Sequence, residues 1–191
     1  MKKHISSFVI ILIVSIGGFA QVSDKTVETI KKVYLEIYAQ AIACETDDDK
    51  GKFGPLFMNT LTINSGNHQW RAVGIYGKTY KFFYTGGDTE ASMYPDKLVL
   101  VKLDRRESNR TYKEEFLFSK NGTLAYYAQR AENDDQSPES RELYFSNQLA
   151  IRIVEDAKTR DRLSFADTKV AKNAIATATA INDLFQRSIN R

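Results

Sequence analysis

The sequence of 191 residues contains one cysteine, two histidines and three prolines, and these scarcities exclude several classes of protein. The single cysteine, Cys44, cannot form an intramolecular disulfide, so the fold must depend on a hydrophobic core. Two histidines are too few for the usual histidine-rich zinc sites, and no Gly-x-Ser-x-Gly motif of serine hydrolases is present. We therefore expect no metal and no cofactor. The net charge of only +3 gives no electrostatic basis for binding nucleic acid.

Residues 1–20 have the three parts of a secretory signal peptide. Two lysines stand near the start, an unbroken apolar run follows over residues 8–14, and small residues precede a cleavage point after Ala20. The apolar run is shorter than the roughly 20 residues that cross a bilayer. We predict a cleaved leader and a single exported domain over residues 21–191, periplasmic or secreted. That domain has a net charge of +1, since two lysines are lost, and no transmembrane segment. An uncleaved N-terminal anchor is the alternative.

Two segments have the spacing of amphipathic helices. Over Ser23–Ala43 the apolar residues fall on one face, and Ser23 or Asp24 is placed to cap the free N–H groups at the start. A second apolar stripe recurs over Asp167–Ile189, with Asp167 as the expected cap. Both helices are predicted to cover a sheet.

Between these helices the pattern changes to strands joined by short turns. Turn signals occur at Gly77-Lys78, Asn121-Gly122 and Asn147-Gln148. Consecutive strands with such short connections cannot be parallel. The sequence therefore predicts an α+β domain, a single antiparallel, meander-like sheet of about eight strands with both helices packed on one face. The predicted strands are Leu56–Ile63, Trp70–Tyr76, Thr79–Tyr84, Lys97–Leu103, Tyr112–Ser119, Thr123–Arg130, Arg141–Ser146 and Leu149–Val154.

The Asn121-Gly122 turn predicts the register of its hairpin. A two-residue turn places Leu117 opposite Tyr126 and Phe118 opposite Ala125. Core-facing residues are then expected to be Phe116, Phe118, Ala125 and Tyr127. Tyr126 is expected on the other face of the sheet.

The hairpins contain a weak repeat, in which EEFLFSKNGTL over 114–124 is echoed by RELYFSNQL over 141–149. The segment Tyr112–Ile153 resembles a group of uncharacterised exported proteins of gram-negative bacteria. These share hairpins of the form E-x-x-[YF]-[FL]-x-x-N-G-x-L followed by R-E-x-Y-F-x-N-x-L. In the present chain Gln148 stands where glycine is usual. The resemblance implies an envelope or secreted protein, and it transfers no catalytic residue.

Paired carboxylates are the one catalytic arrangement that the composition permits. Glu114, Glu115 and Glu142 lie near the starts of neighbouring hairpins, and glycosidases use two acids about 5–10 Å apart. Three arginines nearby in the chain offer a simpler interpretation, that of cross-strand ion pairs with these acids: Arg130, Arg141 and Arg152. We expect no enzymatic activity, with a two-carboxylate glycoside hydrolase as the less favoured alternative.

Aromatic residues are the stronger indication of a binding surface. Trp70, Tyr126 and Tyr144 are the predicted binding residues, because aromatic rings on an open sheet face stack on sugar rings or apolar partner surfaces. The leading hypothesis is an exported, non-enzymatic domain that binds a protein or envelope component through a sheet face. A carbohydrate-binding module with an exposed row of aromatics is the alternative.

Three remaining features have simpler interpretations. The acidic segment 45–54 has lysine at the position where a calcium loop needs glycine, so we predict a solvated loop. His68 follows a turn and is expected to be exposed. Charged residues precede Cys44, which excludes a lipoprotein cleavage box and leaves a small hydrophobic residue near a helix end.

Overall fold

The computed structural model describes residues 15–46, 56–72, 74–86, 95–135 and 137–189, with side chains from residue 24 onward. Helix α1 (Ser15–Thr46) comes first in the chain and helix α2 (Phe165–Ile189) comes last. The strands between them are β1 (Phe57–Ile63), β2 (Gln69–Trp70), β3 (Gly74–Gly86), β4 (Pro95–Glu107), β5 (Arg110–Phe118), β6 (Leu124–Glu132), β7 (Ser140–Ser146), β8 (Leu149–Glu155) and β9 (Lys158–Arg160).

The strands form one antiparallel sheet in which chain neighbours are almost always sheet neighbours. The order is β1-β3-β4-β5-β6-β7-β8-β9, and the short β2 pairs with β3 outside this path. The predicted α+β class, with a meander-like sheet and a helix at each end of the chain, is confirmed. Strand β9 follows a tight turn and was not predicted, because its three residues carry no alternating pattern.

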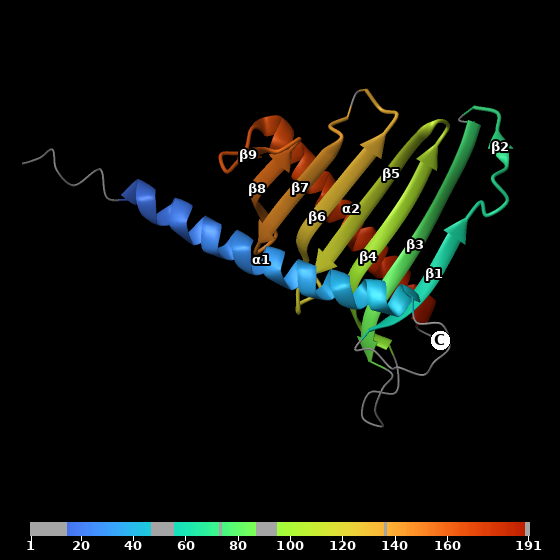
Figure 1. Cartoon of the computed structure of the whole chain (residues 1–191), viewed down its shortest axis with the longest axis horizontal. Helices are drawn as coiled ribbons and strands as arrows, with labels where there is room; N and C mark the ends of the chain where they lie inside the picture. Colours follow the sequence, from blue (N-terminus) through green and yellow to red (C-terminus); the bar gives the residue numbers. More distant parts are fainter. Residues whose placement is uncertain (1–14, 47–55, 73, 87–94, 136, 190–191) are drawn as a thin grey trace, which may run out of the picture.

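The two helices pack on opposite faces of the sheet, so the prediction that both cover one face is wrong. Helix α1 crosses in front of the strands and α2 runs behind them (Figure 1). The reason lies in pairs of large apolar neighbours within single strands, such as Phe82 and Phe83 or Phe116 and Leu117. Successive side chains point to opposite faces, so such pairs need cover on both sides.

Each helix therefore has its own hydrophobic core. The core beneath α2 includes Phe82, Val101, Phe116, Phe118, Leu124, Tyr127 and Leu143 of the sheet, with Ala174, Ile181 and Phe185 of the helix. The core beneath α1 includes Phe83, Leu100, Leu117, Tyr126 and Tyr144 of the sheet, with Val27 and Ala41 of the helix. Among the described residues, each face of the sheet thus has a buried cluster beneath a helix.

The register of the β5–β6 hairpin is confirmed over most of its length. Leu117 lies opposite Tyr126, and Tyr126 is on the face opposite Phe116, as predicted. The prediction for Phe118 is wrong, because a register shift after Leu117 places it opposite Leu124. The turn is longer than two residues, with Gly122 at φ 75°, and this extra length creates the bulge. Leu124 thus takes the core position predicted for Ala125.

Strand β3 continues through Gly77-Lys78, where the sequence predicted a hairpin. Gly77 pairs with Arg106 of β4, so its backbone belongs to the ladder. The turn lies earlier, and Gly74 at φ 68° ends it. Long pairing with β4 outweighs the local preference of one glycine for a turn.

Both helix starts differ from their predictions. Helix α1 begins at Ser15, so Ser23 and Asp24 are interior residues and not caps; no proline interrupts the chain before Pro55. At α2 the cap is Ser164, whose Oγ accepts from the backbone N–H of Asp167 at 3.1 Å. Asp167 reciprocates by accepting from the Ser164 N–H at 2.9 Å, which is a capping box. Most of the acidic segment predicted to be a loop lies outside the described residues.

Candidate functional site

A groove lies on the α1 face of the sheet, between helix α1 and strands β5, β6 and β7. These three strands extend beyond the helix in Figure 1. Its volume is about 650 Å³, within the range of roughly 300–1,000 Å³ that is typical of small-molecule sites. We call it the α1 groove. Helix α1 contributes Lys31, Tyr34, Leu35 and Tyr38, and the sheet contributes Lys113, Glu115, Tyr126, Ala128, Gln129, Arg130, Ser140, Arg141 and Glu142.

The floor of the α1 groove is built from side chains in register. Glu115 pairs with Ala128, and Ala128 pairs with Glu142, so the two glutamates flank one methyl group across three strands. Two strand spacings separate their backbones by roughly 10 Å. Because alanine is small, the space between the carboxylates is left open.

A row of different charge lies one step further along the strands. Lys113 pairs with Arg130, and Arg130 pairs with Ser140. These residues are two positions from the glutamate row, so they face the same side of the sheet about 7 Å away. The α1 groove therefore has an acidic row on its floor and a basic row toward its rim.

The two groove glutamates have no cationic partner among the described residues. Neither Glu115 nor Glu142 lies within 4.0 Å of a Lys or Arg nitrogen there, although both are half-buried. The other described carboxylates that are buried or half-buried all have such a partner: Glu45, Glu107, Glu114, Asp134, Glu155 and Asp167. Among the described residues, these two glutamates thus differ from the other buried or half-buried carboxylates in lacking a close ion pair, although Lys31, Lys113, Arg130 and Arg141 also line the α1 groove.

Tyrosine hydroxyls supply the only hydrogen bonds given to these glutamates within the described part of the chain. The Tyr34 hydroxyl donates to Oε2 of Glu115, and the Tyr144 hydroxyl donates to Oε2 of Glu142 at 2.6 Å. Burial, followed by the hydrogen bond to Glu115, raises the pKa of Tyr34 far above its ordinary value. Burial and then Glu142 raise the pKa of Tyr144 in the same way. Both hydroxyls therefore stay protonated and act as donors.

Aromatic rings form the wall between α1 and the floor. Tyr34 lies 5.6 Å from Tyr38 and 4.5 Å from Tyr126, measured between ring centroids. Tyr126 in turn lies 5.0 Å from Tyr144. Such faces attract cations, as Lys102 shows by placing its Nζ 4.3 Å from the centroid of the Tyr38 ring.

The three predicted binding residues do not come together. Trp70 is 57% exposed on β2, at the far edge of the sheet from β6 and β7 (Figure 1). Tyr126 is only 4% exposed and Tyr144 only 2%, because α1 covers them. They do not form the exposed aromatic row that was expected, although Tyr126 lines the α1 groove. The sequence suggested Glu115 and Glu142 as catalytic acids or as ion-pair partners of nearby arginines, Arg130 among them, but it did not indicate that Lys113 belongs to the same surface.

The expected ion pairs between the predicted arginines and these glutamates are also wrong. Glu114 points to the α2 face, where it accepts from Nε of Arg105 at 3.1 Å and from the Tyr127 hydroxyl at 3.0 Å. Arg141 borders the α1 groove, but its side chain is on the same face as Glu114 and pairs with Glu155 instead. Arg152 pairs with Asp24 and Asp161. These arginines have acids of their own face within closer reach, and Arg130 has no acid within 4.0 Å in the described residues.

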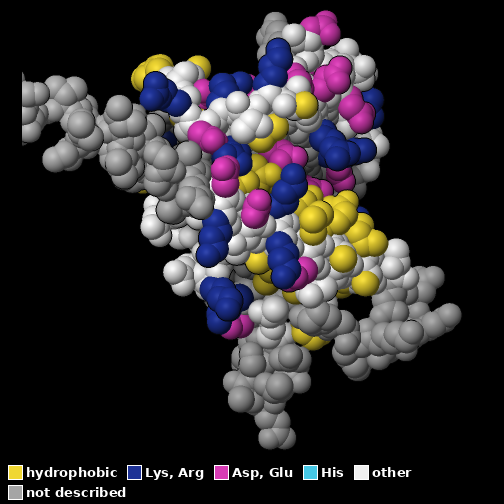
Figure 2. All heavy atoms as spheres, turned by 60° about the vertical axis from the view of Figure 1, so that its left-hand side comes forward, with side chains coloured by type: hydrophobic (Ala, Val, Ile, Leu, Met, Phe, Trp, Pro, Cys, Tyr) yellow, Lys and Arg dark blue, Asp and Glu magenta, His cyan; other side chains and the backbone are white. Residues whose placement is uncertain are grey.

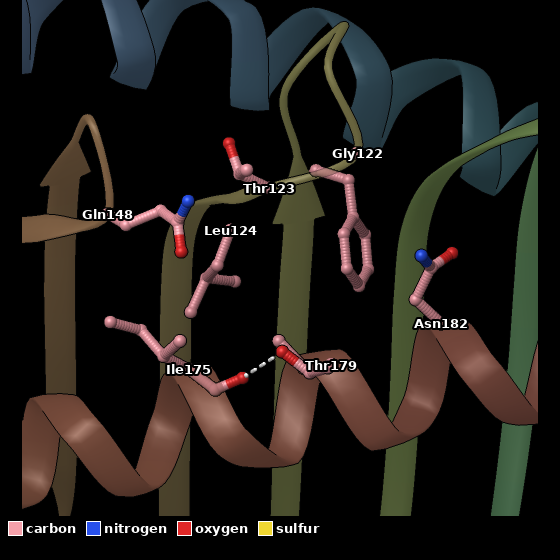
Figure 3. Close-up of a pocket in the computed structure, with 9 residues that line it drawn as sticks. Gly122, Thr123, Leu124, Gln148, Ile175, Thr179 and Asn182 are labelled. Carbon is pink, nitrogen blue, oxygen red and sulfur yellow. Dashed lines mark hydrogen bonds between the residues drawn. The ribbon is translucent and has the colours of Figure 1, made fainter.

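A second cavity lies behind the sheet, between the β5–β6 and β7–β8 turns and helix α2 (Figure 3). Leu124, Ile175 and Gln148 line it, and the Thr179 hydroxyl beside it donates to the Ile175 carbonyl at 3.0 Å. Its volume is about 90 Å³, which is too small for an organic ligand. It is a packing gap beneath two turns.

The remaining predicted features lie away from the α1 groove. His68 is exposed in the loop before β2, as predicted, and Cys44 is half-buried near the end of α1, where its thiol donates to the Leu56 carbonyl at 3.5 Å. Within the described ranges, no three His, Cys, Asp or Glu residues are placed to hold a metal ion. Neither helix, as far as it is described, has an apolar stretch long enough to cross a bilayer. Charges of both signs are interspersed over the face in Figure 2.

Comparison of the chain with family models, with curated proteins and with solved structures found no match.

Proposed function

We propose that this protein is an exported, non-enzymatic domain that binds an envelope component in the α1 groove, through a positively charged group on that component. The observation that supports it is that neither half-buried glutamate of the groove has a Lys or Arg nitrogen within 4.0 Å among the described residues. A ligand cation between Glu115 and Glu142 would give these carboxylates a close partner, and the rings of Tyr34 and Tyr38 would line its path. The leader pattern of residues 1–20 supports export.

The binding role is the one expected from the sequence, but the surface proposed for it is a different one. An open sheet face was expected to carry the ligand, but a helix packs on each face. The part of the α1 face that remains accessible beside the helix is the groove. Trp70 and its neighbour Tyr76, whose ring centroids are 6.3 Å apart, offer a single exposed aromatic site and not a row.

The hydrolase alternative is weaker because of how the two carboxylates are held. A glycosidase needs one carboxyl group that carries a proton to give to the leaving group. Glu115 and Glu142 instead both accept hydrogen bonds from tyrosines whose pKa values are raised. Two acceptors in one groove suit the binding of a cation better than proton donation.

A thermal-shift screen tests the proposal. The full chain, exported and processed by a bacterial host, is screened against peptidoglycan fragments, neutral glycans and an extract of the host envelope. A ligand at 100 times its dissociation constant adds about 2.7 kcal/mol to the free energy of unfolding, which raises Tm by several degrees. We expect a rise with a cationic envelope component, and none with neutral glycans.

The variant pair for this screen is Glu115→Gln with Glu142→Gln, matched by Glu139→Gln with Asp183→Asn. The control residues are an exposed glutamate just before β7 and an exposed aspartate of α2, so both variants lose two negative charges. The proposal expects the groove variant to lose the Tm rise and the control to keep it. An equal rise in both variants, or a rise with neutral glycans alone, would contradict it.

A further inference from the structure

We infer, on the basis of the proposed function, that the ligand of the α1 groove is a short peptide with a free amino end and a free carboxyl end. The amino group lies between Glu115 and Glu142, and the carboxylate reaches Arg130 and Lys113. The inference depends on the spacing and sign of the two charged rows. It identifies the chemical class of the ligand, which the proposed function leaves open.

The distance between the rows matches the length of an extended dipeptide. The glutamate row and the basic row are two residues apart along β5, β6 and β7, which is a step of about 7 Å. Two extended residues of a ligand span about 7 Å as well. A ligand that carries an ammonium group at one end and a carboxylate at the other can therefore contact both rows at once.

The basic row can supply the positive charge that such a carboxylate needs. Within the described residues, Arg130 has no acid within 4.0 Å, and the exposed Lys113 has only the distant contact of 4.0 Å with Glu132. The guanidinium group of an arginine can bind a carboxylate through two parallel hydrogen bonds. Ser140, half-buried and in register with Arg130, adds a hydroxyl beside it.

The same arrangement selects against other charged ligands. A phosphate-rich polymer would meet the arginine but would be repelled by the two glutamates on the floor. A simple amine would satisfy the glutamates and leave Arg130 without an anion. Only a ligand with both charges compensates both rows.

Isothermal titration calorimetry with three matched probes tests the inference. The probes are alanyl-alanine, its N-acetyl form and its C-terminal amide, titrated into the full chain as exported by the host. Each blocked probe loses one charge and keeps the same backbone. We expect alanyl-alanine to bind about tenfold to a hundredfold more tightly than either blocked probe, because each loses charge-assisted hydrogen bonds.

Two variants assign each end of the probe to its row. Arg130→Gln should weaken the binding of alanyl-alanine about tenfold or more. It should leave the binding of the amide unchanged, since the amide has no carboxylate to contact Arg130. Glu142→Gln should weaken the binding of alanyl-alanine and of the amide, which both carry the ammonium group. It should leave the binding of the N-acetyl form unchanged. Arg187→Gln, an exposed residue of α2, is the matched control and should change nothing.

The outcomes separate the inference from the proposed function. If the blocked probes bind as tightly as alanyl-alanine, or if Arg130→Gln weakens all three alike, the short-peptide inference is overturned. The inference is also overturned if none of the three probes binds. In either case a Tm rise with envelope extract that the groove variant loses still supports the proposed function, so the two can fail separately.

Discussion

Glu115 of β5 and Glu142 of β7 face the same groove from either side of Ala128, and neither has a Lys or Arg nitrogen within 4.0 Å in the described part of the chain. One residue earlier, Glu114 lies on the other face, 93% buried and paired with Arg105. Two consecutive glutamates thus have different environments because successive side chains of a strand point to opposite faces. The first is buried on the α2 face, and the second lines the α1 groove.

Substitution of these neighbours should separate the two roles. Glu114→Gln leaves the Arg105 guanidinium partly buried with one acid fewer, so we expect the free energy of unfolding to fall by about 2–3 kcal/mol. Glu115→Gln breaks no close ion pair and keeps an acceptor for the Tyr34 hydroxyl. The free energy of unfolding should therefore change by less than about 1 kcal/mol. Urea denaturation of the ligand-free protein measures both. Equal losses would show that Glu115 is structural.

The turn between β8 and β9 offers a stabilising substitution. Ala157 has φ 66°, a left-handed conformation that costs non-glycine residues about 1 kcal/mol. Because Ala157 is exposed, Ala157→Gly should raise the free energy of unfolding by about 0.5–1 kcal/mol. The exposed helical Ala180→Gly is the matched control and should lower it by about 1 kcal/mol. The two urea midpoints should therefore move in opposite directions, and movement in the same direction would refute the turn argument.

Asp167 should make the free energy of unfolding depend on pH. Hydrogen bonds from Arg160 chiefly, and from Ser164, lower the pKa of Asp167 to about 2 from its ordinary 3.8. The folded state thus favours the ionised carboxylate, which stabilises the protein above about pH 4 and loses this effect as the pH falls toward 2. Asp167→Asn should cost about 1–2 kcal/mol at pH 7.

Denaturation curves at pH 7, 4 and 2 check this expectation. The difference between the wild type and Asp167→Asn should shrink as the pH falls from 4 to 2. Asp183→Asn, an exposed residue of the same helix, is the control. A difference between the wild type and Asp167→Asn that stays constant across the three pH values would be inconsistent with a stabilising charge on Asp167.

The leader prediction has a direct test. Intact-mass measurement of the exported protein should show a chain that begins at Gln21, and Ala20→Arg should block that cleavage because the peptidase requires a small residue there. After cleavage, helix α1 would lose its first residues and could begin no earlier than Gln21, instead of at Ser15. A mass that retains residues 1–20 would favour the uncleaved anchor.

The fold was predictable where local patterns dominate. The Asn121-Gly122 signal gave the pairing of Leu117 with Tyr126, and the short turns gave an antiparallel meander. The bulge at Phe118 was not predictable, since it depends on how the turn backbone closes. The placement of the helices had a signal that was overlooked: Phe82-Phe83 and Tyr126-Tyr127 put large rings on both faces, which requires cover on both.

The candidate site was less predictable than the fold. Glu115 and Glu142 could be named from the sequence, but their alignment across Ala128 depends on the β6–β7 register. The connection between those strands is too long to fix that register by turn geometry. The path of α1, which turns an open sheet face into a groove, depends on long-range packing of residues such as Val27 and Ala41.

Amide chemical-shift mapping of the exported protein with the low-mass fraction of its own envelope extract tests the central claim most directly. The account predicts that the perturbed amides cluster at Tyr34, Glu115, Ala128, Arg130 and Glu142, around the α1 groove. It also predicts that Glu115→Gln with Glu142→Gln abolishes these shifts. Perturbations centred on Trp70 and Tyr76, with the α1 groove unaffected, would contradict the account and identify the exposed aromatic edge as the binding surface.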